Sequence, residues 1–218
     1  MEVEALLAWA RGPGFEWALL IMFGGITLRL IEIATLGRKR DLSLPREGKG
    51  SGWRTIVSRF FSFPLLATTN VITYVAGYIF HLGLLIIIFF LVPHIEVWRG
   101  VLPFTWGGLP TTIIDLVTVL TMVAMGLLLF DRLTHPVKRL LSTAGDYLAW
   151  TVTFLPLLTG YCTYHHLFFD YSLLLALHIL SVELLMVVFP FSKLIHALTT
   201  FSSRWFTGEQ FGHKGVTS

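Results

Sequence analysis

Five long apolar segments constrain this chain more than any other feature of its sequence. They lie near residues 15–37, 64–93, 112–130, 146–165 and 171–195. Each is long enough to cross the bilayer core as an α-helix, which takes about 20 apolar residues. The apolar residues form continuous runs and do not alternate with polar ones, as they would in a membrane β-barrel. The sequence therefore predicts an all-α integral membrane bundle of five transmembrane helices.

The composition agrees with a membrane location. Hydrophobic residues make up 55% of the 218 residues and charged residues only 13%, whereas ordinary soluble domains carry about 25% charged residues. The isoelectric point near 9.2 would fit nucleic-acid binding, but the basic residues lie between the apolar segments, where membrane topology places them. We therefore expect one domain over residues 1–218 in the cytoplasmic (inner) membrane, with multiple passes, in contact with lipid and with no nucleic acid.

The basic residues also predict an orientation. Two of them lie on one side of the predicted bundle, and thirteen lie on the other side, where the positive-inside rule puts the cytoplasm. We therefore expect the N-terminus outside and the C-terminus inside. The two outer residues are Arg11 and Arg99; the inner ones are Arg38, Lys39, Arg40, Arg46, Lys49, Arg54, Arg59, Arg132, Lys138, Arg139, Lys193, Arg204 and Lys214.

Three histidines within or at the ends of the apolar segments are candidate cofactor ligands. His178 lies in the fifth segment and His196 directly follows that segment, eighteen residues after His178, so in one continuous helix they would share a face. His81 lies near the middle of the second segment. Histidines on two helices can supply both axial ligands of a haem iron, and the chain's single cysteine, Cys162, excludes an iron–sulfur cluster held by this chain alone. The alternative is that these imidazoles only form hydrogen bonds between helices.

Two short motifs resemble a known family. The stretch FPFSKLIH (189–196), with His178 eighteen residues before its end, and the stretch FHLG (80–83) are similar to the respiratory nitrate reductase gamma subunit family. That family includes the membrane cytochromes b associated with sulfite reduction and with heterodisulfide reductase-like complexes. The resemblance implies one or two haem b groups and electron transfer between membrane quinol or quinone and an iron–sulfur subunit on the inner face. It also implies that His81 and His196 ligate the inner haem and that His178 ligates the outer haem.

The sequence departs from the family pattern at one ligand. The nitrate reductase pattern has a second histidine ten residues after the one matching His81, and here that position is Leu91. His94 is one replacement, if Pro93 bends the helix and so corrects its angle. His165 or His166 is another. The third reading is that no outer haem exists and that His178 lines a quinol pocket.

The sequence thus favours a quinone-interacting electron-transfer subunit of an oxidoreductase complex. A haem-free transporter with a histidine proton relay and a purely structural membrane anchor remain as alternatives. Arg29 and Glu32, three residues apart near the inner end of the first segment, are predicted to form an ion pair. The polar stretch GEQFGHKG (208–215) is expected to be an extended inner tail that contacts a soluble partner.

Overall fold

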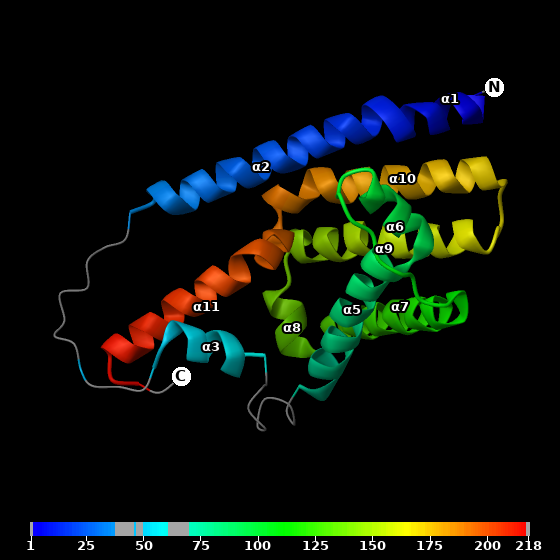
Figure 1. Ribbon diagram of the computed structural model, residues 1–218. Coiled ribbons are helices and arrows are strands. Elements are labelled where there is room, and N and C mark those ends of the chain that lie inside the picture. The colour runs from blue at the N-terminus through cyan, green and yellow to red at the C-terminus, as the bar shows by residue number, and fades with distance from the viewer. Residues whose placement is uncertain (1, 38–45, 47–49, 61–69, 217–218) are drawn as a thin grey trace. The chain divides into compact units, whose positions relative to one another are not determined.

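The computed structural model describes residues 2–37, 46, 50–60 and 70–216, and these residues are almost entirely helical (Figure 1). No β-strand occurs within those ranges; the only bridge there is an isolated one between Arg46 and Lys214. The predicted all-α class is therefore confirmed. The start of the second predicted segment, residues 64–69, lies outside the described residues.

Within the residues that the structure describes, four helices are long and apolar enough to cross a membrane. They are Glu2–Thr35, Val71–Phe90, Thr111–Thr134 and Tyr171–Phe191, which correspond to the first, second, third and fifth predicted segments. The fourth segment forms helix α9, Ala144–Tyr164. This helix has the length of a span, but its several Thr, Tyr and Gly residues make it less apolar than the other four. The chain is therefore a multi-pass membrane protein by length and composition.

The chain divides into two compact units. The first comprises Met1–Trp17 and Asn70–Leu185, and the second comprises Ala18–Thr69 and Met186–Ser218. Helices of the first unit are α1 (Glu2–Trp9), the π-helical turn η1 (Ala10–Gly14), the start of α2 (Phe15–Thr35), α5 (Val71–Phe90), α6 (Val92–Arg99), α7 (Thr111–Thr134), α8 (Pro136–Leu141), α9 and most of α10 (Tyr171–Val188). The second unit holds the rest of α2, α3 (Gly52–Ser58), the 3-10 turns η2 (Phe189–Phe191) and η3 (Lys193–Ile195), and α11 (His196–His213).

The close crossing of α5 and α7 forms the core of the first unit. Gly83 on α5 lies directly against Thr121, where a Cβ atom would collide with the threonine hydroxyl. Small residues permit such approach between membrane helices. One helical turn farther along both helices, Ile87 and Met125 form a buried cluster with Leu157, which joins α5, α7 and α9.

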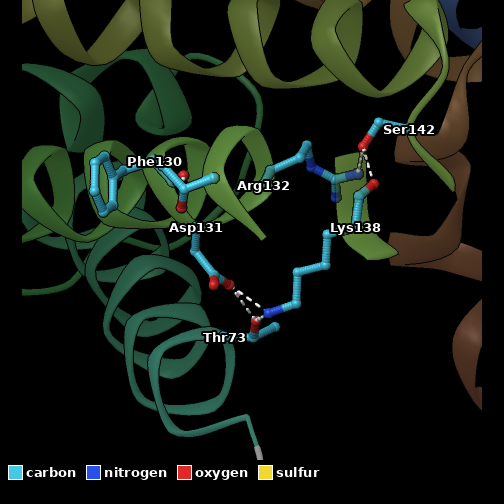
Figure 2. Close-up of polar contacts among 7 residues, drawn as sticks. Thr73, Phe130, Asp131, Arg132, Lys138 and Ser142 are labelled. Carbon is cyan, nitrogen blue, oxygen red and sulfur yellow. Dashed lines mark hydrogen bonds and ion pairs between the residues drawn. The ribbon is translucent and has the colours of Figure 1, made fainter. Parts of the chain in front are cut away.

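Polar contacts tie together the other ends of these helices (Figure 2). Asp131, near the end of α7, is 9% exposed and pairs with Lys138 on α8. Thr73 on α5 donates a hydrogen bond to the Asp131 carboxylate at 2.9 Å. Arg132 donates to the Ser142 hydroxyl at 3.0 Å and lies 3.3 Å from the carboxylate of Asp146 at the start of α9. These polar contacts therefore join four helices, α5, α7, α8 and α9, at this end of the unit.

The fifth predicted segment is not one continuous helix, and this corrects the expectation that His178 and His196 share a helix face. Helix α10 ends at Val188, two 3-10 turns follow, and α11 begins at His196. Pro190 has no N–H to continue the helical ladder, and Ser192 is fully extended, with φ −120° and ψ −178°. The rule of 100° per residue therefore does not relate the directions of His178 and His196.

In the second unit, α2 contacts the turn that contains Pro190. Gly25 lies against the proline ring, where a Cβ atom would be too close. Arg29 donates to the Pro190 carbonyl at 3.1 Å and to Glu32 at 2.6 Å. The predicted Arg29–Glu32 ion pair is confirmed.

Helices α3 and α11 pack backbone to backbone in the same unit. Gly50, which precedes α3, lies against Gly212, and Gly52, the first residue of α3, lies against the ring of Trp205. Gly208 on α11 lies against the carbonyl of Ser51. Each of these glycines has no room for a Cβ atom. The prediction of an extended tail over residues 208–215 was wrong for most of that stretch, because α11 continues to His213 and packs on α3.

Candidate functional site

A break between α5 and α6 shapes the candidate site. Helix α5 ends at Phe90, Leu91 has an extended conformation, and α6 begins at Val92. Pro93 lies in the first turn of α6, where a missing N–H is tolerated, but in a continuous helix its ring would clash with the carbonyl of Phe89. The predicted effect of Pro93 is therefore observed as a full helix break.

The last carbonyl groups of α5 have partners beyond the helix, although the Ile87 carbonyl also keeps its helical hydrogen bond from the N–H of Leu91. Trp98 Nε1 donates to the Ile88 carbonyl at 3.4 Å, and Trp106 Nε1 donates to the Phe89 carbonyl at 2.5 Å. The N–H of Leu109 donates to the Phe90 carbonyl at 3.0 Å. The Ile87 carbonyl lies 2.9 Å from Nδ1 of His94. The C-terminal end of α5 thus holds the imidazole of His94 in place.

His94 and His178 come together in the first unit. Their ring centres lie 6.2 Å apart and their ring planes differ by 16°. An imidazole nitrogen binds a metal at about 2 Å and the ring centre lies roughly 1 Å farther, so axial ligands on opposite sides of one iron have centres about 6 Å apart. The observed separation of the ring centres equals this value.

His178 is held by α9. Thr159 Oγ1 lies 3.2 Å from Nδ1 of His178 and 2.9 Å from the hydroxyl of Ser181. The imidazole packs over Gly160, where a Cβ atom would lie 3.0 Å from Cε1 of the ring. A hydroxyl and a missing side chain on one helix thus position a histidine on the next.

Both imidazoles have the hydrogen-bonding pattern of metal ligands. Metal-binding histidines commonly engage their second ring nitrogen with a backbone carbonyl or another polar group, which fixes the ring. In His94 and His178 Nδ1 has such a contact, so Nε2 is the nitrogen that a ligand bond would use. Burial lowers the pKa of His94 below its usual value, against the opposing effect of the Ile87 carbonyl. The neutral imidazole that a metal requires is therefore the favoured form near neutral pH.

The other two histidines that the sequence offered for this role have different partners. His165 Nε2 lies 3.1 Å from Oδ1 of Asp115 on α7. His166 has a φ of 52°, and its ring lies 5.1 Å from the ring of Tyr171. Of the replacements for Leu91, the structure brings only His94 to His178 within the described residues.

The predicted inner pair shows the same Nδ1 pattern, one histidine at a time. His81 Nδ1 lies 2.6 Å from the carbonyl of Gly77 in α5, and His196 Nδ1 lies 2.8 Å from the carbonyl of Lys193. His81 belongs to the first unit and His196 to the second. Their pairing across one iron therefore stays a prediction.

The sequence reasoning missed Thr159 and Gly160. Their signal was a small polar pair within an apolar segment, one turn before its end, but such pairs also serve ordinary helix packing. Only the position of His178 against them gives them a role. Within the described residues no group of three or more His, Cys, Asp and Glu side chains is placed to hold a metal ion.

Comparisons with known proteins give one full-length relative. A curated protein of Nitratidesulfovibrio vulgaris (strain Hildenborough), described only as "Protein", is 26% identical over 217 residues, which cover 96% of this chain and 95% of the relative. No family model matches the chain. No solved structure matches it either. The sequence similarity thus extends over nearly the whole length of that relative, whose printed description states no activity.

Proposed function

We propose that this chain is a haem b-containing membrane subunit. It transfers electrons between membrane quinol or quinone and an iron–sulfur subunit on the inner face of the cytoplasmic membrane, as part of a respiratory oxidoreductase complex. The resemblance of FPFSKLIH and FHLG to the nitrate reductase gamma subunit family supports this proposal.

One observation carries the proposal. Two imidazoles from separate helices lie with their ring centres 6.2 Å apart and their planes nearly parallel, and Nδ1 of each contacts a polar atom. Two imidazoles that ligate one iron from opposite sides have about this separation between their ring centres. The separation therefore supports axial ligation by this pair.

The chain's own residues bind and orient the cofactor. The end of α5 fixes His94 through the Ile87 carbonyl, and α9 fixes His178 through Thr159. The bound haem supplies reversible one-electron transfer, and the protein sets its ligands, hydrogen bonds and dielectric surroundings. His81 and His196 are the proposed ligands of a second, inner haem.

The proposed topology has five spans, with the N-terminus outside. The four apolar helices then need one more crossing, and α9 has 21 residues, about 30 Å of helix. With α9 as a span, the Asp131–Lys138 network lies at the inner end of α7 and the His94–His178 pair lies toward the outer side. Electrons would pass between outer and inner haems, and the iron–sulfur partner would be the acceptor or donor inside.

Reduced-minus-oxidised absorption of the purified protein tests the proposal. We expect a b-type haem signal and two haems per chain in the wild type after haem-replete expression. His94→Ala and His178→Ala should each remove the outer haem, whereas His165→Ala should leave both haems in place. A protein that folds but binds no haem would refute the proposal. If the wild type binds one haem, and both His94→Ala and His178→Ala keep it, the outer site alone would be refuted.

A further inference from the structure

A pocket in the second unit is lined only by basic and hydroxyl-bearing residues. It lies between α3 and α11, and we name it the α3–α11 pocket. Of the described residues that line it, none is acidic. The lining residues are Thr55, Arg59, Ser203, Arg204 and Thr207.

Two polar atoms of the lining residues are buried and have no hydrogen-bond partner within the part of the chain that the structure describes. They are Oγ1 of Thr55, a residue that is only 1% exposed, and Nη1 of Arg204. A buried donor left unpaired costs about 1–3 kcal/mol, and more when it carries charge. The guanidinium is held in position, because its carbon lies 4.6 Å from the centre of the Phe60 ring. The protein thus holds a cation beside the pocket without giving one of its donors an acceptor.

The shape of the pocket is fixed by the backbone. The close approach of Gly50 and Gly52 to α11, and of Gly208 to α3, leaves these two helices little freedom to slide. Two arginines and three hydroxyl-bearing residues then line one pocket. Guanidinium groups bind phosphate through parallel charge-assisted hydrogen bonds, and hydroxyl groups add donors to the remaining oxygens.

The chain connectivity places this pocket near the membrane surface. Helix α11 begins at His196, five residues after Phe191, where an apolar helix long enough to span ends. Aromatic side chains of the same two helices are exposed, with Trp53 at 69% and Phe201 at 52%. Exposed aromatic rings on short helices beside basic groups are typical of elements that lie in the interfacial layer of a bilayer.

We propose that the α3–α11 pocket binds the phosphate group of an anionic phospholipid. Arg59 and Arg204 pair with the phosphate, the hydroxyl groups of Thr55, Ser203 and Thr207 complete its shell, and the aromatic rings lie among the lipid chains. The bound lipid attaches the α3–α11 pair to the inner membrane surface, where anionic lipids attract basic segments. This role does not depend on haem.

Native mass spectrometry of the full-length protein in detergent tests the proposal. Phosphatidylglycerol is added, with phosphatidylcholine as the zwitterionic comparison, and bound lipid is counted. The test variant Ser203→Asp puts a negative charge at the pocket, and Ser202→Asp puts the same charge one residue away, outside the lining. We expect Ser203→Asp to lower phosphatidylglycerol retention at least about tenfold and Ser202→Asp to lower it less than about twofold.

Three outcomes would overturn the proposal. Equal losses from the two variants would mean that general surface charge, and not the pocket, retains the lipid. Displacement of phosphatidylglycerol by millimolar inorganic phosphate would assign the pocket to a free anion. Unchanged lipid retention in Ser203→Asp, together with loss of a copurifying soluble subunit, would make the pocket a protein-docking surface. Far-ultraviolet circular dichroism and thermal unfolding of both variants show that each is folded.

Discussion

The substitution Thr159→Val tests whether α9 positions an outer haem ligand. Valine keeps the shape of threonine but removes the hydroxyl, which lies 3.2 Å from Nδ1 of His178 and 2.9 Å from Ser181 Oγ. Loss of one group that orients a metal-bound histidine typically costs 10–100-fold in metal affinity. At about 1.4 kcal/mol per factor of ten, this is roughly 1.4–2.8 kcal/mol.

Haem titration measures this effect. Protein expressed without haem is titrated with haemin, and the outer site is followed by absorption and by its midpoint potential. Thr163→Val is the matched control, since its hydroxyl donates to the Thr159 carbonyl at 2.7 Å and lies one helical turn from the hydroxyl that contacts His178. We expect Thr159→Val to weaken the outer site alone. Equal changes in the two variants, or an unchanged outer site in Thr159→Val, would refute the positioning role.

Three further predictions concern the site and the helix bundle. Gly160→Val should displace the imidazole of His178 and remove the outer haem signal, whereas Gly126→Val, at a position with open space for a Cβ atom, should not; haem-to-protein stoichiometry checks both. Asp131→Asn removes the charged partner of a lysine in a half-buried network and should lower stability by roughly 1–3 kcal/mol, measured by thermal unfolding in detergent. His196→Ala should remove one haem while the outer haem keeps its potential; loss of both haems from a protein that remains folded would contradict separate sites.

The helical class and the apolar segments were predictable because they depend on local composition. Continuous apolar runs give helices in a bilayer whatever their neighbours are, since each backbone polar group must be bonded within the segment. Pro93 was likewise a readable signal, because its missing N–H acts on the residues next to it in the chain. The less apolar α9 was predicted as a helix from the same pattern.

The positions of the histidines required the tertiary structure. A count of 100° per residue placed His178 and His196 on one face, but the turn at Pro190 and the extended Ser192 ended that phase. By the same count, His94, thirteen residues after His81, would lie about 140° from the face of His81 in a continuous helix. The break at Leu91 instead brings His94 to His178. The rule of 100° per residue holds only within an unbroken helix. Beyond each break, the direction of a histidine depends on how the helices pack, and so does its assignment as a ligand.

The sequence by itself determined a helical membrane chain, Pro93 as a place where a helix could bend, and the histidines available as ligands, because these follow from residue chemistry and near neighbours. Only the tertiary structure decided that His94 meets His178, that Thr159 and Gly160 support that meeting, and that Thr55 and Arg204 share one pocket. Each of these contacts joins residues on different helices. Their distances depend on how closely glycine and hydroxyl side chains allow those helices to approach.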